Sequence, residues 1–113
     1  MSYHLDNVEF DFRRVTTEDA LKVKSAMMIL ANEKAPTSTI IEANSIIDDL
    51  AFKYVKIKDK KGQWLETQSA DEAKLIANSM FENEFASIEI VAKFQERLQG
   101  FLSALPSFQK AKK

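Results

Sequence analysis

The sequence contains few side chains that could perform chemistry, and they do not converge on a site. His4 is the only histidine and there is no cysteine, so a zinc site would need several carboxylates around one imidazole. We interpret His4 as exposed to solvent. Acids occur in adjacent pairs, but adjacent positions on a helix diverge by about 100° and do not flank one substrate. The pairs are Glu18 and Asp19, Asp48 and Asp49, and Asp71 and Glu72.

Motifs for phosphate binding and nucleophilic catalysis are also missing. Gly62 and Gly100 are the only glycines, whereas a phosphate-binding loop needs closely spaced ones. No serine lies in a G-x-S-x-G elbow or beside a second histidine that could act as its base. We therefore expect no catalytic residue, no metal, no cofactor and no enzymatic activity.

One short segment is basic, between residues 53 and 61. Its lysines could follow a nucleic acid backbone while the nearby Tyr54 and Trp64 stack on bases. Alternatively, they form a solvated sheet edge that discourages unwanted strand pairing. We favour the edge because the segment has no arginine and the formal net charge of the chain is −1. The lysines are Lys53, Lys56, Lys58, Lys60 and Lys61.

Length and composition indicate one small folded domain. The chain has 113 residues, of which 45% are hydrophobic and 29% charged, as in folded proteins of a single domain. We expect this domain to span residues 1–106 and residues 107–113 to form a flexible tail. The absence of cysteine suits a reducing cytoplasm, and we expect neither a signal peptide nor a membrane span.

Apolar spacing predicts a mainly α fold with about four helices. The first helix is expected over about 18–34, behind the hydroxyls of Thr16 and Thr17. Thr39 and Glu42 have the spacing of a capping box for a second helix, and Ser69 and Glu72 repeat it for a third. A fourth helix begins near Ser87, unless the last two form one bent rod.

Two segments alternate as strands do. Val8, Phe10 and Phe12 share one side of a short N-terminal strand. Residues 55–66 resemble a small hairpin, although the second helix could instead continue to Lys58 and be followed by a loop. We expect the N-terminal strand to pair either with residues 55–58 of its own chain or with a neighbouring subunit, in which case Phe10 and Phe12 form the self-association edge.

The chain has more large apolar side chains than four short helices can easily shelter. One stripe on the fourth helix repeats at three- and four-residue steps. Phenylalanine and methionine make adaptable surfaces for apolar partner helices, although filling the core of the monomer is the alternative for any single residue. The candidate partner-binding residues are Val91, Phe94, Leu98, Phe101 and Phe108.

The whole arrangement resembles a known family. The segment "YHLDNVEFDFRRVTTEDALKVKSA" combines an extended acidic and aromatic lead with a capped helix, and a cysteine-free helical body follows. In this order of segments the chain is similar to the tail assembly chaperones of long-tailed bacteriophages, particularly the tape-measure chaperones of phages of Gram-positive hosts. The resemblance covers most of the chain but includes no signature motif.

The resemblance implies a non-enzymatic protein of the host cytoplasm that coats the long helical tape-measure protein until the tail tube forms, often in several copies. Each apolar contact would be weak, and an array of such contacts would be strong through multivalency. The rival interpretation is a small nucleic-acid-binding or regulatory protein that uses the lysines of residues 53–61. A third is a permanent structural subunit, which would remain in the finished particle.

Overall fold

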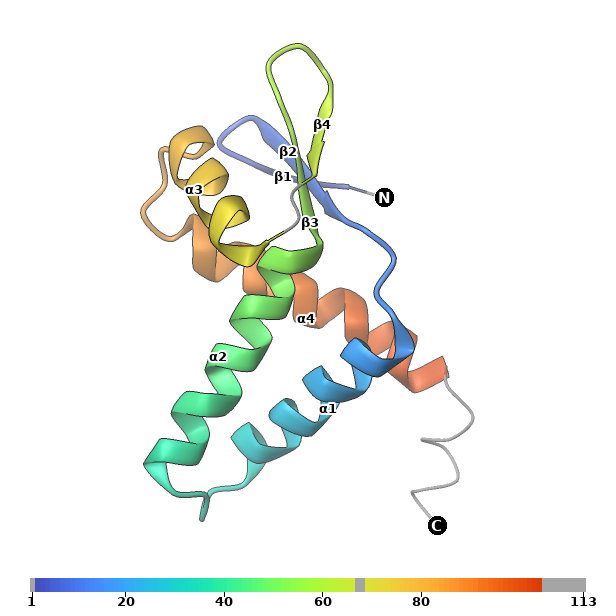
Figure 1. Cartoon of the computed structure of the whole chain (residues 1–113), viewed down its shortest axis with the longest axis vertical. Helices are drawn as coiled ribbons and strands as arrows, with labels where there is room; N and C mark the ends of the chain where they lie inside the picture. Colours follow the sequence, from blue (N-terminus) through green and yellow to red (C-terminus); the bar gives the residue numbers. More distant parts are fainter. Residues whose placement is uncertain (1, 67–68, 105–113) are drawn as a thin grey trace.

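The chain folds as α+β, with four helices and a four-stranded antiparallel sheet (Figure 1). The computed structural model describes residues 2–66 and 69–104, with side chains described up to residue 100. The strands are β1 (Tyr3–Leu5), β2 (Val8–Phe12), β3 (Val55–Lys58) and β4 (Trp64–Glu66). The helices are α1 (Thr17–Ala31), α2 (Thr37–Tyr54), α3 (Ala70–Met80) and α4 (Ala86–Ala104). The expected tail, 107–113, lies outside the described residues.

The expectation of a mainly α fold is wrong, because the four strands form one continuous antiparallel sheet instead of a lone strand and a separate hairpin. Neither the β1–β2 pair nor the β3–β4 pair is long enough to be stable alone. The structure joins them through β2 and β3, with Phe10 opposite Ile57 and Phe12 opposite Val55. The N-terminal strand therefore pairs within its own chain, and a second strand, β1, precedes it.

Alternation along the strands builds the core. Phe10 and Phe12 are buried together with Val55 and Ile57 on the adjacent strand. Figure 1 shows the strands at one end of the molecule, the α1–α2 pair at the other, and α4 crossing between them. The ring of Phe94 on α4 lies 5.3 Å from that of Phe12, so α4 joins the sheet to the helical end.

Two tight turns set the strand register. Asp6 and Asn7 have φ angles of 53° and 63°, the left-handed region that the two central residues of a type I′ hairpin turn require. In the second hairpin, the Asp59 carboxylate accepts hydrogen bonds from the backbone amides of Lys61 and Gln63 at 2.9 and 2.8 Å. The structure therefore has the hairpin at 55–66 that was one of the two alternatives.

Hydroxyl caps fix two of the helix starts. Thr16 and Ser69 each accept a hydrogen bond from the amide three residues later, at 3.2 Å, as the sequence predicts. The capping box at Thr39 is wrong, because α2 already begins at Thr37 behind Pro36, a residue whose fixed φ suits a helix start. Helices α3 and α4 are separate and are joined by residues 81–85.

Candidate functional site

The described residues do not assemble a catalytic or metal-binding constellation. Within 2–66 and 69–104, no group of three or more His, Asp or Glu residues could hold a metal ion. The Nε2 atom of His4 lies 3.6 Å from Oε1 of Glu9 on the next strand, and His4 is exposed as expected. This histidine contacts one carboxylate, which is too few ligands for a zinc site.

The carboxylate of Asp19 is buried, and the groups around it stabilise the fold. Asp19 is 6% exposed and accepts hydrogen bonds from the Tyr54 hydroxyl at 2.5 Å and from Nζ of Lys53 at 2.9 Å. The hydrogen bond from Tyr54 lowers the pKa of Asp19; burial opposes this effect, and Lys53 adds to it. The cluster ties the start of α1 to the end of α2.

The lysines of residues 53–61 do not share one surface. Lys53 belongs to α2 and pairs with Asp19. Lys56 and Lys58 lie on β3, and their Nζ atoms are 4.9 and 5.4 Å from the centre of the Trp64 ring. Nζ of Lys58 is also 3.5 Å from Glu9. Lys60 and Lys61 are exposed in the turn.

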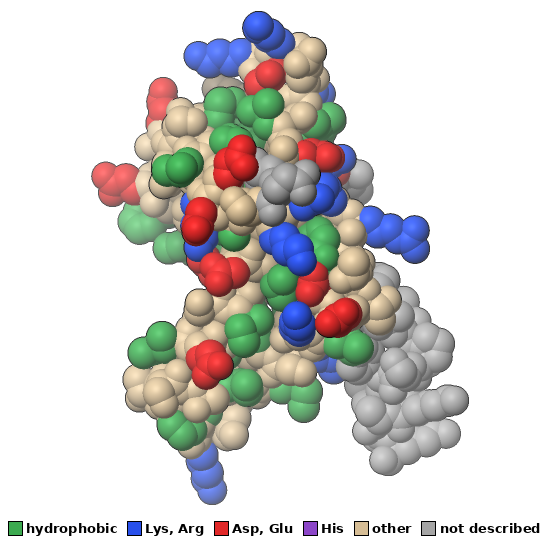
Figure 2. All heavy atoms as spheres, viewed as in Figure 1, with side chains coloured by type: hydrophobic (Ala, Val, Ile, Leu, Met, Phe, Trp, Pro, Cys, Tyr) green, Lys and Arg blue, Asp and Glu red, His purple; other side chains and the backbone are tan. Residues whose placement is uncertain are grey.

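Acidic neighbours surround these lysines as well. The strand register places Lys56 opposite Asp11 on one side and opposite Glu66 on the other. On the face shown in Figure 2, Lys and Arg side chains alternate with Asp and Glu side chains instead of forming one basic field. This mixture weakens the attraction of the segment for a phosphate backbone.

The candidate partner-binding stripe on α4 is mostly occupied by the core of the chain. Phe94 and Leu98 are buried at 0% and 2% exposure, and the ring of Phe94 lies between those of Phe12 and Tyr54. Val91 is half-buried. The side chain of Phe101 and the whole of Phe108 lie outside the described residues.

The candidate self-association residues are also internal. Phe10 and Phe12 are 1% and 5% exposed. Strand β2, which carries them, pairs with β1 on one side and β3 on the other. A neighbouring chain therefore cannot add to β2, and the outer strands of the sheet are β1 and β4.

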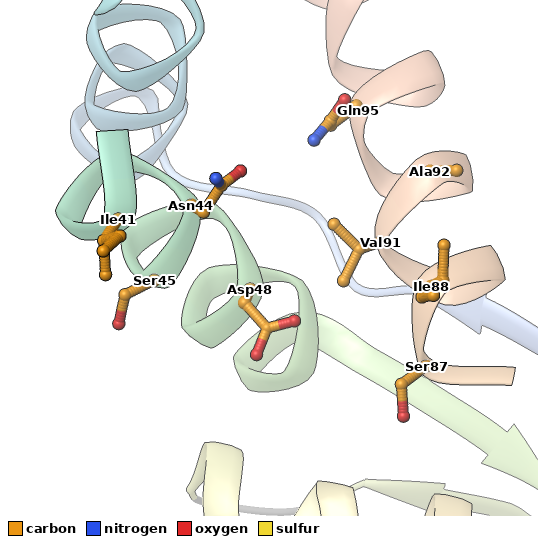
Figure 3. Close-up of a pocket in the computed structure, with 9 residues that line it drawn as sticks. All are labelled: Ile41, Asn44, Ser45, Asp48, Ser87, Ile88, Val91, Ala92 and Gln95. Carbon is orange, nitrogen blue, oxygen red and sulfur yellow. The ribbon is translucent and has the colours of Figure 1, made fainter. Parts of the chain in front are cut away.

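An apolar groove between α2 and α4 remains open to solvent (Figure 3). Its volume is about 630 Å³. Ile41 and Ile88 line it and are 64% and 66% exposed, although isoleucine is usually buried. Val91 lies between them and points toward α2 in Figure 3. The other lining residues are Asn44, Ser45, Asp48, Ser87, Ala92 and Gln95.

A three-residue ionic cluster lies at the α3 end of this groove. Nζ of Lys74 on α3 is 3.2 Å from Asp48 and 3.1 Å from Asp49, both on α2. Partial burial favours the neutral amine of Lys74, but its hydrogen bonds to Asp49 and Asp48 raise its pKa overall. The cluster therefore holds α3 against α2 and leaves the centre of the groove to uncharged side chains.

No family model matches this chain, and no curated protein or solved structure matches it. The groove must therefore be interpreted from its own geometry. Among the described residues, no helix is both long enough and apolar enough to cross a membrane.

The sequence contained a signal for this groove that the periodicity argument passed over. Ile41 follows the half-buried Ile40, and Ile88 is offset from the fully buried Ile90. Large apolar residues beside a core stripe widen it beyond the arc that one neighbouring element covers. Such widening on two helices that pack together predicts an apolar groove. The sequence does not show, however, that α2 packs against α4.

Proposed function

We propose that this chain is a non-enzymatic chaperone of phage tail assembly, which binds helical segments of the tape-measure protein in the α2–α4 groove. One observation carries the proposal: Ile41 and Ile88, two large apolar side chains outside the core, line the same groove. Grooves between helices accept the apolar face of an amphipathic helix, with anchors three, four and seven residues apart. The resemblance of the sequence to tail assembly chaperones supplies the identity of the partner.

The dimensions of the groove suit a weak, reversible contact. Two isoleucines and the half-buried Val91 offer a small apolar area, and each methylene group removed from water contributes about 0.8 kcal/mol. A single groove therefore holds its partner loosely, as a chaperone must if the tail tube is to displace it. Several copies along one long helical partner would bind it strongly through multivalency. We propose that the protein acts in this way in the host cytoplasm, as an oligomer.

The groove supports this function better than the lysines of residues 53–61 support nucleic acid binding. Lys53 and Lys58 already pair with Asp19 and Glu9. Lys56, the other lysine of β3, lies opposite Asp11 on β2 and Glu66 on β4. A chain with a net charge of −1 also lacks the overall field that attracts nucleic acid.

The proposal is tested by co-purification from phage-producing cells. A tagged wild-type chain should retain a long, helix-rich phage protein, identified by mass spectrometry, and the finished virion should lack the chaperone. The double variant Ile41→Gln, Ile88→Gln should lose most of this partner. Glutamine is a good helix former and leaves the charge unchanged, so this variant removes the apolar contact alone.

A matched control uses two exposed apolar residues elsewhere. Met28 on α1 and Leu75 on α3 are 65% and 70% exposed and do not line the groove. The double variant Met28→Gln, Leu75→Gln should retain the partner at the wild-type level. Equal loss in both double variants would contradict the groove as the binding site, and nucleic acid as the sole retained partner would contradict the chaperone function.

A further inference from the structure

The two outer strands of the sheet, β1 and β4, each have one side without a partner strand. Within the described part of the chain, β1 pairs only with β2, and β4 pairs only with β3. An outer strand presents unpaired main-chain N–H and C=O groups, to which another chain can add a further strand. The β3–β4 hairpin also projects beyond the helices in Figure 1.

Neither outer strand carries the side chains that usually prevent such pairing. Proteins protect an outer strand with lysine, with proline or with a charged side chain that points toward the core. The sequences of β1 and β4 are YHL and WLE, without lysine or proline. The lysines of this sheet, Lys56 and Lys58, lie on β3, which is an inner strand. They therefore do not form the protected sheet edge that the sequence led us to favour.

The side chains on the core side of both outer strands are apolar. The register sets Leu5 opposite Val8, and Leu65 opposite the buried Ile57. Leu5 and Leu65 are only half-buried, because no further strand covers them. A strand added at either edge would bury apolar surface as well as form main-chain hydrogen bonds.

The main-chain groups of His4 point to the open side of β1. Leu5 and Val8 flank the two-residue turn of the first hairpin, so they are its closing hydrogen-bonded pair. Hydrogen-bonded and non-hydrogen-bonded pairs alternate along an antiparallel ladder. The N–H and C=O of His4, the next residue of β1, are therefore directed away from β2.

The same alternation directs the main-chain groups of Trp64 and Glu66 to the open side of β4. The Asp59 amide donates a hydrogen bond to the Gln63 carbonyl at 2.8 Å, which fixes the phase of the β3–β4 ladder. The side chains of Trp64 and Glu66 lie on the solvent side of the sheet, opposite lysines of β3. The side chain of His4, opposite Glu9, lies on the same side.

The directions of the strands make the two edges complementary. Each strand is antiparallel to its neighbour in the order β1-β2-β3-β4, so β1 and β4 run in opposite directions. A second copy in the same orientation can therefore place its β4 antiparallel to β1 while the core sides of both sheets face the same way. One kind of contact then covers both edges, whereas β1–β1 or β4–β4 pairing leaves the other edge open.

From this arrangement we infer that a second copy of this chain binds the first head to tail, by adding its β4 to β1. The register that sets Leu5 beside Leu65 on the core side places His4 opposite Glu66 on the solvent side. Repetition of such a contact gives a ring or an open chain of subunits. The inference goes beyond the proposed function, because it names the contact between the copies that multivalent binding requires.

The short strands make each contact weak. Each outer strand has three residues, so one junction forms few hydrogen bonds, and short outer strands limit pairing by themselves. Self-association of the free protein should therefore depend strongly on its concentration. Copies that are held along one long partner have a higher effective concentration, so the same contact should then form readily.

Disulfide trapping tests the pairing, because the chain has no cysteine of its own. Opposite residues of a hydrogen-bonded antiparallel pair have Cα atoms about 5.5 Å apart, a separation that a disulfide spans. Oxidation of an equal mixture of His4→Cys and Glu66→Cys chains should yield a linked dimer as the main product. Each variant alone should remain mostly unlinked. A chain that carries both substitutions should form a ladder of dimers, trimers and larger species.

A matched mixture controls for random collisions. Glu33 is exposed in the α1–α2 connection, away from both edges, so Glu33→Cys mixed with His4→Cys should form little dimer. Non-reducing electrophoresis measures all products, and circular dichroism confirms that each variant is folded.

A second measurement does not depend on cysteine. By sedimentation velocity, the mean mass of the wild type should rise with protein concentration. His4→Pro should remain a monomer, because proline removes an N–H that points outward and leaves the ladder with β2 intact. His4→Thr keeps this N–H and suits a strand, so it should associate as the wild type does.

Three results would overturn the inference. The first is a mixture of His4→Cys and Glu66→Cys that links no more than the Glu33→Cys control. The second is a single variant that links to itself as readily as to the other variant, which would indicate β1–β1 or β4–β4 pairing. The third is a wild type that stays monomeric at every concentration. None of these experiments contains the tape-measure protein, so co-purification still decides the proposed function separately.

Discussion

The Tyr54 hydroxyl, in the last turn of α2, donates a 2.5 Å hydrogen bond to the Asp19 carboxylate in the first turn of α1. Tyr54 is immediately followed by β3, and its ring stacks against Phe94 with centroids 6.4 Å apart. The Thr16 hydroxyl, which caps α1, lies 3.3 Å from the same phenolic oxygen. One side chain therefore links both helices, the sheet and α4.

We predict that Tyr54→Phe lowers the free energy of unfolding by about 1–2 kcal/mol, because a hydrogen bond to a buried charged group is lost while the ring stays in place. Urea denaturation followed by circular dichroism measures the change. Tyr3→Phe is the matched control, since it keeps the Tyr3 ring stacked on Phe10 at 5.5 Å. An equal cost in both variants would contradict a special role for the Tyr54 hydroxyl.

A second prediction concerns acid stability. Because Tyr54, and then Lys53, hold the pKa of Asp19 below its usual value against the effect of burial, the ionised carboxylate stabilises the fold. This contribution is fully present above the usual carboxyl pKa of about 4 and is lost as the pH falls through the lower folded-state value. Stability should therefore fall with decreasing pH below about 4.

The variant Asp19→Asn isolates this titration. It should be less stable than the wild type at neutral pH, and its stability should change less steeply in the acid range. Glu18→Gln, at the exposed neighbouring position, should leave the acid dependence as in the wild type. Parallel acid profiles for the wild type and Asp19→Asn would show that Asp19 does not control this range.

Substitution by alanine should have opposite effects on stability at Phe94, on α4, and at Phe85, just before α4. Phe94 is fully buried, whereas Phe85 is 65% exposed. We predict that Phe94→Ala costs about 3–5 kcal/mol, the range for large truncations in a core, and that Phe85→Ala stays within about 0.5 kcal/mol of the wild type. Thermal and urea unfolding measure both. A stable Phe94→Ala protein that has lost only its partner would restore Phe94 as a contact residue.

Local features of the fold could be predicted from the sequence, and nonlocal ones could not. The caps at Thr16 and Ser69 depend on spacings of three residues, which the sequence displays directly. The pairing of Phe10 with Ile57 depends on residues far apart in the chain, so the sequence left pairing of the N-terminal strand with residues 55–58 and pairing with a neighbouring subunit as alternatives. The period of Val91, Phe94 and Leu98 shows that one face of α4 is apolar but not what covers it.

The same reasoning explains the outcome for the candidate site. The apolar stripe on α4 could have belonged to the core or to an interface, and only its neighbours in the folded chain distinguish the two. The neighbour of Phe94 is Phe12 on β2. The groove residues Ile41 and Ile88 belong to two helices that meet only in the folded chain. Sequence reasoning could find the apolar surplus, but its location needed the packing of α2 against α4.

The final prediction separates the groove from the lysines of residues 53–61. Replacing Lys56, Lys58, Lys60 and Lys61 by glutamine should leave co-purification of the tape-measure protein at the wild-type level, because none of these residues lines the groove. The stability cost should also be small, since the Lys58–Glu9 pair is only partly buried and its Nζ–Oε1 distance is long at 3.5 Å, and surface ion pairs contribute about 0–1 kcal/mol. Pull-down with mass spectrometry and a gel shift with a single-stranded oligonucleotide give the two readouts. If this variant loses both oligonucleotide binding and the co-purified partner, the lysines and not the groove carry the function.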